Sequence, residues 1–307
     1  MLHCAGWSSY FEHVIMWSPC PSERILTVVL PYYNDNIHLC RQLAHFQKLP
    51  TQHRRQLCLI IIDDASMMHA LDVNCTGLGH LSSFVPDYEL RLYRIIQDIP
   101  WNQGGAKNLG AAAASSEWLF FLDQDQELSD NLVPNLLHAL VGPINSLPAV
   151  PDYCLPVNSD HIVWRFERPP TSKAYEVFHP SMMAMRRSFF WRANGFNEDF
   201  SGNWGHEDSE FKLRLRMFHR GGLAANDQML GRALPNATVR MDPQDRHVHG
   251  CRTRKDLKHN SALFTQLREQ YINASCTAHM NCLPLDCQPE RPPLRFGWYK
   301  LRHVCGS

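Results

Sequence analysis

Short apolar runs separated by helical patterns dominate the first 125 residues. Apolar residues spaced by three and four, as at Leu39, Leu43 and Phe46, predict helices between the runs, and residues 104–116 are Ala-rich and helix-forming. Runs that are apolar at nearly every position indicate strands buried on both faces, hence a parallel sheet covered by helices. These runs lie at residues 25–30, 57–62 and 118–122, with a weaker alternating run at 90–96.

The pattern weakens in the second half of the chain. Residues 142–180 are rich in Pro and loops, and the chain beyond Gly250 is polar and then rich in Pro and Cys. Helices are predicted at 131–141, 189–193 and 207–219, and a short strand at 181–186. Residues 1–23 read as an irregular leader.

Composition narrows the class of protein. The chain has 307 residues, of which 44% are hydrophobic and 20% charged, as expected for one large α/β domain or two joined halves. Thirty basic residues balance thirty acidic ones, so no nucleic-acid partner is expected.

The location in the cell is predicted from segments that the sequence lacks. No run of about 20 apolar residues suggests a membrane-spanning helix, and residues 1–20 do not resemble a secretory signal. We expect a cytoplasmic protein with peripheral membrane association. The alternative is the Golgi lumen, if an anchor is missing from this chain.

The cysteines and glycosylation sequons carry little signal by themselves. Eleven cysteines occur without a CxxC pair, which argues against a zinc knuckle or redox motif. Free thiols are preferred over a disulfide or metal remnant for the group Cys276, Cys282 and Cys287. Sequons occur at Asn74, Asn236 and Asn273, and without a visible signal we interpret them as chance.

Acidic residues follow the strand expected at 118–122. Ligands of open α/β sheets bind beyond the carboxyl ends of the strands. Asp123 and Asp125 lie there in a DxD pattern, and together they could hold Mn²⁺ or Mg²⁺, hard cations that favour carboxylate and phosphate oxygens. Such a cation neutralises a diphosphate leaving group. The alternative is a solvated turn whose acids cap the next helix.

The neighbouring motifs resemble glycosyltransferase family 2. Residues 102–110 (NQGGAKNLG) and 117–125 (EWLFFLDQD) match its Gly-x-Ala-Arg-Asn-x-Gly helix and the strand ending in an acid pair. Lys107 replaces the usual Arg, which keeps the charge but loses bidentate phosphate recognition. Residues 30–34 (LPYYN) and 62–66 (IDDAS) fit the same family.

That resemblance implies a GT-A fold, a mostly parallel central sheet flanked by helices, with a UDP-sugar donor. It implies that Asp64 contacts the uracil base, and we expect the diphosphate near Lys107. The nucleotide would lie over Pro31, Tyr33 and Asn34, and Asp123 would reach the ribose or a metal-bound water.

A second group of motifs resembles the acceptor half of galactosyl- and N-acetylgalactosaminyltransferases. It comprises residues 195–200 (GFNEDF) and 204–211 (WGHEDSEF). An acid in the first turn of a helix is favoured in its ionised form, so it could deprotonate an acceptor hydroxyl. We expect Asp208 as the base and Glu207 as an acceptor ligand, with the roles exchangeable. Trp204 and Gly205 are expected to bind the acceptor, the alternative for Trp204 being core packing.

Two histidines follow in the segment 246–250 (RHVHG). His247 and His249 share a face of an extended segment, and a neutral imidazole can complete the coordination of Mn²⁺. The resemblance implies a late His ligand, and His249 is preferred because the stretch after it, with Asn260 and a Leu-Phe pair, fits the family. The metal set is then Asp125, Asp123 and His249, the alternative being a surface pair of histidines.

The resemblance covers roughly residues 25–260. It predicts a nucleotide-sugar-binding half at 24–128, an acceptor-binding half at 129–260 and an unassigned tail at 261–307. The expected activity is metal-dependent transfer of a hexose or N-acetylhexosamine from a UDP-sugar to a hydroxyl of a glycan, polysaccharide or glycolipid. Inversion is expected from a single in-line base, and single-sugar transfer from the absence of a Gln-x-x-Arg-Trp segment and membrane helices.

Two other functions compete with this prediction. A sugar-1-phosphate nucleotidyltransferase would carry a Gly-rich signature with Arg and Lys at its first strand, which residues 30–36 do not have. A non-catalytic sugar-binding relative would have lost the acid pair or the Glu-Asp segment, and both are present.

Overall fold

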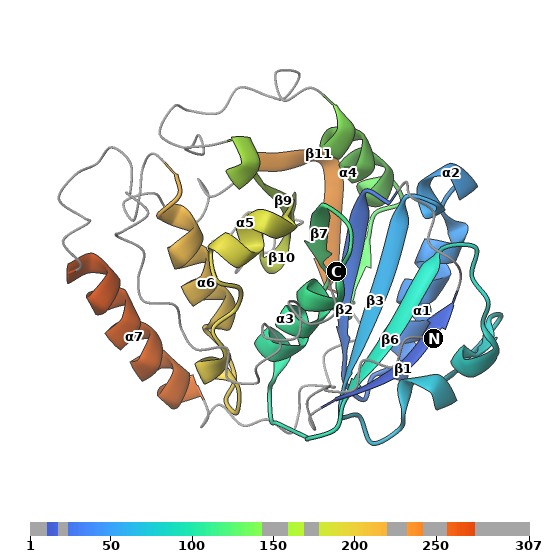
Figure 1. The fold of residues 1–307 in the computed structure, drawn as a ribbon, viewed down its shortest axis with the longest axis horizontal. Coiled ribbons are helices and arrows are strands. Elements are labelled where there is room, and N and C mark those ends of the chain that lie inside the picture. Colours follow the sequence, from blue (N-terminus) through green and yellow to red (C-terminus); the bar gives the residue numbers. More distant parts are fainter. Residues whose placement is uncertain are drawn as a thin grey trace, which may run out of the picture.

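The structure is a computed structural model that describes residues 11–17, 24–142, 159–168, 178–219, 232–241 and 257–273. A nine-stranded sheet in the order β1-β6-β3-β2-β7-β10-β9-β11-β8 lies at its centre, with helices on both faces (Figure 1). The strands are β1 (Phe11–Trp17), β2 (Leu26–Tyr32), β3 (Leu57–Asp64), β6 (Glu89–Ile95), β7 (Trp118–Phe121), β8 (Gln126–Leu128), β9 (Val163–Glu167), β10 (Phe178–Arg186) and β11 (Arg232–Met241). A separate hairpin pairs β4 (Asn74–Cys75) with β5 (Gly79–His80). The helices are α1 (Asn36–Lys48), α2 (Thr51–Arg54), α3 (Gln103–Ala113), α4 (Leu132–Val141), α5 (Arg187–Arg192), α6 (Glu207–Arg216) and α7 (Leu257–Asn273).

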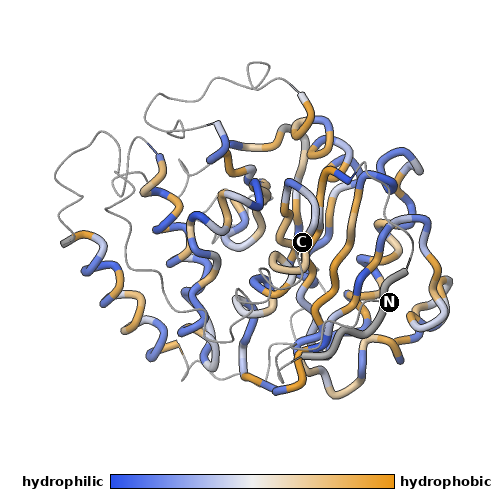
Figure 2. Tube along the Cα trace, in the orientation of Figure 1, coloured by the Kyte–Doolittle hydropathy of each residue, from blue (hydrophilic) through white to orange (hydrophobic). Residues whose placement is uncertain are grey.

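The four strands β6, β3, β2 and β7 run parallel, as the continuous apolar runs predicted. Successive side chains of a strand point to opposite faces. Val28 and Leu30 therefore join the core under α1 and α4, whereas Val29 joins the core under α3, α5 and α6. The strands are hydrophobic along most of their length (Figure 2).

The second half of the sheet is mixed rather than parallel. Strand β10 pairs antiparallel with both β7 and β9, and β11 pairs parallel with β9 but antiparallel with β8. Strand β10 therefore runs antiparallel to β7, beside the strand that leads into the acid pair.

Both ends of the described chain contain a regular element that the sequence analysis did not predict. The expected irregular leader contains β1, which pairs antiparallel with β6 at the sheet edge. Edge strands tolerate polar residues, and Glu12 and His13 interrupt the apolar run by which a strand is recognised in the sequence. Helix α7 crosses the expected boundary at residue 260 and lies beside α6. The division at residue 128 stays a prediction.

A disulfide joins Cys40 on α1 to Cys75 on β4, with Cα atoms 5.2 Å apart. Spacing alone does not predict the pairing of these two cysteines, which are 35 residues apart. The bond fixes the small hairpin against the helix that covers the sheet. Cys276, Cys282 and Cys287 lie outside the described residues.

No helix in the described ranges combines the length and the apolar character that crossing a bilayer requires.

Candidate active site

The loops that follow β2 and β3 are tied together at the carboxyl edge of the sheet. The Asn34 side chain accepts a hydrogen bond from the backbone N–H of Met67 at 2.7 Å, and the Asn34 backbone N–H donates to Ser66 Oγ at 3.0 Å. Asn34 has φ 51°, a left-handed conformation that Asn tolerates better than most residues. Asp35 caps α1 by accepting from the backbone N–H of His38 at 3.2 Å. Asn34 is therefore the residue that ties the loop after β2 to the turn after β3.

The predicted nucleotide residues Pro31 and Tyr33 lie at the same edge. Pro31 is opposite Ile62 in the parallel register of β2 and β3. The Tyr33 backbone N–H donates to the Gln124 side chain at 3.2 Å, which links this loop to the segment between Asp123 and Asp125. The structure thus brings the predicted nucleotide and metal segments together.

The two acids at the end of β3 have different environments. Asp63 is fully buried and accepts hydrogen bonds from the backbone N–H groups of Ser66 and Ala70, at 2.9 and 3.1 Å, and from Arg94 at 2.9 Å. These contacts hold the turn. Asp64 accepts from Asn102 Nδ2 at 3.0 Å. Asp64 remains the predicted base-binding acid, because the contacts of Asp63 serve the fold.

A cleft of about 700 Å³ opens beside this turn. Its volume is typical of small-molecule sites. Of the predicted nucleotide residues it includes Asn34 alone, and Met67, which is 91% exposed, adds apolar surface. The lining residues are Asn34, Asn36, Met67, Met68, His69, Asp72 and Arg94.

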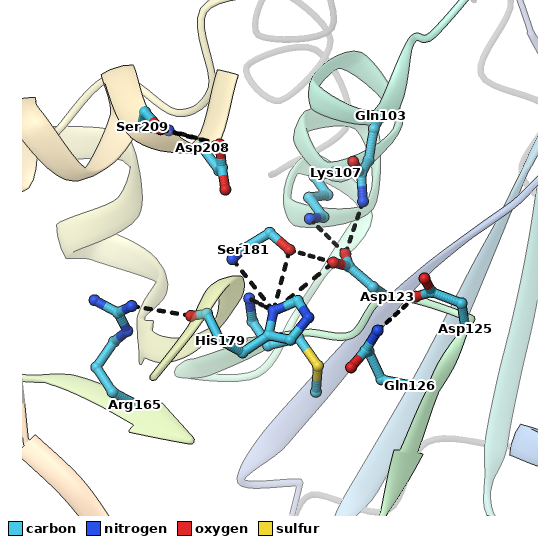
Figure 3. A network of polar contacts seen from close by, with 11 residues as sticks. Gln103, Lys107, Asp123, Asp125, Gln126, Arg165, His179, Ser181, Asp208 and Ser209 are labelled. Atoms are coloured by element: carbon cyan, nitrogen blue, oxygen red, sulfur yellow. Dashed lines mark hydrogen bonds and ion pairs between the residues drawn. The ribbon is translucent and has the colours of Figure 1, made fainter. Parts of the chain in front are cut away.

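Asp123 is the centre of a polar network drawn from three elements (Figure 3). Lys107 Nζ and Gln103 Nε2, both on α3, donate to Asp123 Oδ1 at 2.8 and 2.7 Å. Ser181 Oγ on β10 donates to Asp123 Oδ2. Burial alone would raise the pKa of Asp123, but the Lys107 ammonium and the remaining contacts outweigh it and lower the pKa. Both carboxylate oxygens therefore already have donors from the protein.

Lys107 was expected near the diphosphate, and the contacts that the structure shows for it are with other residues of the protein. Its side chain is almost fully buried, pairs with Asp123 and lies over the ring of Phe196, 5.4 Å from the centroid. In this position Lys107 fixes the Asp123 carboxylate through an ion pair. Its contact with the diphosphate stays a prediction.

Asp125 is the member of the acid pair better suited to a cation. It is partly buried, and Gln126 Nε2 donates to its Oδ1 at 3.0 Å. No cluster of three His, Cys, Asp or Glu side chains that could hold a metal occurs in the part of the chain that the structure describes. Magnesium-type sites often use one or two carboxylates and complete their shell with substrate phosphates and water. Asp125 fits such a site, whereas His247 and His249 lie outside the described residues.

His179 was not singled out from the sequence, yet its ring lies close to the Asp123 carboxylate. Its Nδ1 lies 4.0 Å from Asp123 Oδ2 and accepts from the backbone N–H groups of Ser181 and Met182, at 3.3 and 3.2 Å. Burial lowers the pKa of His179, against the opposing effect of the Asp123 charge. A neutral ring that accepts at Nδ1 shapes the irregular start of β10, which carries Ser181.

The predicted catalytic acids occupy the first turn of α6. Asp208 Oδ1 accepts from the backbone N–H of Ser209 at 2.8 Å, and the side chain extends toward the Asp123 network (Figure 3). Glu207 is 7% exposed, and its Oε1 accepts from Trp101 Nε1 at 3.2 Å. Its Oε2 is buried with no hydrogen-bond partner among the described residues. Burial, and then the charge of Asp208, raise the pKa of Glu207 to about 7.

Two tryptophans form an aromatic wall beside these acids. Trp204 is 41% exposed, so core packing does not explain it. The ring of Trp101 meets it edge to face, with centroids 6.0 Å apart and planes at 81°. Trp101 has φ 51°, an unfavourable conformation for a bulky residue, and no motif pointed to it. Gly205 follows Trp204 with φ 91°, which favours glycine.

The site thus comprises the Asp123 network, the Asp208 side chain that extends toward it, and the buried Glu207 beside two tryptophans. Perturbed carboxyl groups and an unpaired buried oxygen are typical of catalytic sites. The geometry is suited to activating a hydroxyl group near a bound anionic leaving group.

Comparisons with known proteins agree with this geometry. A model described as glycosyl transferase family 2 matches residues 27–194, more than half of the chain. A second model, described as the N-terminal domain of galactosyltransferase, matches residues 161–228. These ranges include the acid pair and the Glu207-Asp208 segment, respectively.

Curated relatives are similar over part of their length. The chain is 26% identical over 228 residues to a validoxylamine A glucosyltransferase of Streptomyces hygroscopicus subsp. limoneus, covering 62% of this chain and 48% of the relative. It is 22% identical over 221 residues to N-acetylgalactosaminyltransferase 6 of Drosophila melanogaster, covering 62% of this chain and 31% of that protein. The chain thus spans half or less of the length of these relatives.

Solved structures share the fold at low identity. S. aureus TarS in complex with UDP-GlcNAc superposes with a TM-score of 0.55 and 12% identity, over 82% of this chain and 67% of that chain. The mannosyltransferase PcManGT of Pyrobaculum calidifontis, in complex with GDP-Man and Mn²⁺, gives 0.53 and 18%, over 95% and 79%. The expected GT-A fold is confirmed. From the match of the family model over more than half of its length, the chain belongs to glycosyl transferase family 2.

Proposed function

We propose that this protein transfers a hexose or N-acetylhexosamine from a UDP-sugar to a hydroxyl group of a carbohydrate acceptor. The observation that carries the proposal is the arrangement of Asp208 on α6 opposite the Asp123 network. An in-line displacement requires the base and the leaving group on opposite sides of the reacting carbon.

The donor would bind along the strand ends. Asp64 and Asn34 would contact the nucleoside, because Asp64 ends β3 and Asn34 follows β2 at the carboxyl edge of the sheet, where Asn34 also lines the cleft. Asp123, held ionised by Lys107, would accept from the ribose hydroxyls or a metal-bound water. The structural neighbours named above support the fold, and their donors define the first panel to test.

A divalent cation, Mn²⁺ or Mg²⁺, would be held by Asp125 and His249. When bound, it would supply positive charge to the departing diphosphate. Asp123 would contribute less to this site than Asp125, because Lys107, Gln103 and Ser181 already donate to its oxygens.

Asp208 would act as the base. The acceptor hydroxyl gives its proton to the Asp208 carboxylate, its oxygen bonds to the anomeric carbon, and UDP leaves with the electrons of the broken glycosidic bond. One base and one displacement invert the anomeric centre. The unpartnered Oε2 of Glu207 suits a second contact with the acceptor, and Trp204 offers a face for the sugar ring.

The test is product analysis. The purified protein is incubated with Mn²⁺, a panel of UDP-sugars and GDP-mannose, and oligosaccharide acceptors, and products are identified by mass spectrometry and NMR. Transfer of one sugar with inverted configuration is expected. A retained configuration would remove the single-displacement mechanism, and a nucleoside triphosphate-dependent product would favour the nucleotidyltransferase alternative. A non-catalytic relative would bind UDP-sugars without any product.

Two features favour the Golgi-lumen alternative over a cytoplasmic location. Disulfides such as Cys40–Cys75 are rare in cytosolic proteins. Asn74 and Thr76 of the Asn-Cys-Thr sequon are both exposed beside that bond. N-glycosidase treatment of the native protein should increase its gel mobility. Unchanged mobility together with thiols at Cys40 and Cys75 that react without reduction would restore the cytoplasmic prediction. Peripheral membrane association and a glycolipid acceptor stay predictions.

A further inference from the structure

Helix α7 begins beyond both segments that the family models match, yet it packs along α6 (Figure 1). Its residue Asn260 is fully buried, although Asn is usually exposed in proteins. A buried amide at a helix contact calls for a hydrogen-bonding reason.

Asn260 faces three backbone carbonyl oxygens of a single turn. Its Nδ2 lies 3.1 Å from Phe200 O, 2.9 Å from Asn203 O and 2.8 Å from Gly205 O. Carbonyl oxygens only accept, so the amide nitrogen, and not the amide oxygen, must face them. The Asn260 side chain therefore links three backbone carbonyl groups of the turn that spans residues 200–205.

A second contact from α7 fixes the end of the same turn. His206 lies at the N-cap of α6, its Nε2 is 3.0 Å from Ser261 Oγ, and its ring stacks on Phe264 with centroids 5.0 Å apart. Tyr271 near the other end of α7 donates to Glu210 Oε1 at 2.6 Å. Helix α7 is thus bonded both to the turn and to α6.

The turn needs such support because its backbone is unfavourable. His206 has φ 72°, a conformation that is unfavourable for a non-glycine residue and persists when the surroundings impose it. Gly202 and Gly205 have φ 102° and 91°. This turn carries Trp204 and leads directly into Glu207.

We propose that α7 is a clamp for the turn 200–206 and that Asn260 is the positioning residue through which it sets acceptor binding. The inference rests on the proposed glycosyltransferase function. The contacts of Asn260, Ser261 and Phe264 described above all go to residues 200–206. Loss of Asn260 should therefore impair the acceptor and spare the nucleotide.

The test is Asn260→Asp, which keeps the size of the side chain but removes the amide donor and turns oxygen toward the three carbonyls. Loss of such buried hydrogen bonds corresponds to about 5- to 100-fold in an equilibrium. We expect the acceptor KM to rise by about tenfold or more, with kcat changed less and the Kd for UDP unchanged. Backbone amides of residues 200–206 should exchange hydrogen faster. His259→Ala, an exposed neighbour on α7, is the matched control and should behave as wild type.

Ser261→Ala is the milder variant if Asn260→Asp does not fold. It should raise the acceptor KM and the exchange rate at residue 206 in the same direction by a smaller factor. An unchanged acceptor KM and unchanged exchange would overturn the clamp, and so would equal losses of UDP and acceptor binding. If the wild-type protein transfers no sugar, the proposed function fails. The exchange measurement then still decides whether Asn260 orders the turn.

Discussion

Glu207 should make the protein less stable as the pH rises, and Glu207→Gln should remove that loss. The group is buried, and its pKa is raised from 4.5 to about 7 by burial and by the Asp208 charge. The folded state therefore holds the proton more tightly than the unfolded state. Stability from this group is complete below pH 4.5, declines as the pH rises, and is lost above about pH 7.

The magnitude follows from the pKa difference. Each pKa unit corresponds to about 1.4 kcal/mol, so ionised Glu207 lowers the free energy of unfolding by about 3 kcal/mol at pH 8. For a chain of this length this is about 5 °C in Tm. Gln keeps the acceptor for Trp101 and stays neutral. The variant should melt about 5 °C higher than wild type at pH 8 and close to it at pH 4.5, while losing sugar transfer.

Calorimetric melting of both proteins at the two pH values measures this effect. Glu269→Gln, which removes an exposed carboxylate on α7, controls for the change in net charge. Equal Tm differences at pH 4.5 and pH 8, or a variant less stable than wild type at pH 8, would refute the assignment of Glu207 as a buried, proton-binding acid. Gain of stability with loss of activity is the pattern expected of a functional residue.

Four other predictions concern separate parts of the molecule. Asp208→Asn should lower kcat by about 10²–10⁴-fold with little change in UDP binding, and unchanged turnover would make Glu207 the base. Asp125→Ala should abolish the stimulation of activity by Mn²⁺, and persisting stimulation would require other ligands. Trp204→Ala should raise the acceptor KM by about 10- to 100-fold without affecting the donor, as expected for loss of about 1.5–3 kcal/mol of apolar burial, and an unchanged KM would return Trp204 to a packing role. Replacing Cys40 and Cys75 by Ser should lower the free energy of unfolding by about 3–4 kcal/mol, measured by denaturant titration, and no loss would show that the bond does not contribute.

The sequence predicted the elements whose burial leaves a strong pattern. Strands β2, β3 and β7 are apolar at nearly every position because helices cover both faces, and this signal is local. Strand β1 was missed because edge strands mix polar and apolar residues. The mixed half of the sheet was missed because pairing direction depends on distant segments.

The candidate site likewise divides into residues that carry a local sequence signal and residues whose contacts depend on the fold. Asp123, Asp208 and Glu207 were predicted because short motifs carry them, and their roles stay predictions. Trp101 was missed, and Asn260 was noted only as part of a stretch that fits the family, since each makes its contact with a residue more than 50 positions away. The Cys40–Cys75 bond is also a property of the fold, because spacing alone does not determine pairing.

Donor-dependent release of UDP tests the central claim most directly. UDP is quantified for wild type and Asp208→Asn, with UDP-sugars and acceptor, in the presence of Mn²⁺ and after chelation. Acceptor-dependent release with Mn²⁺, lost on chelation and reduced at least a hundredfold in Asp208→Asn, is the predicted result. No release from any UDP-sugar, together with no stabilisation of the protein by UDP, would contradict the proposed glycosyltransferase function.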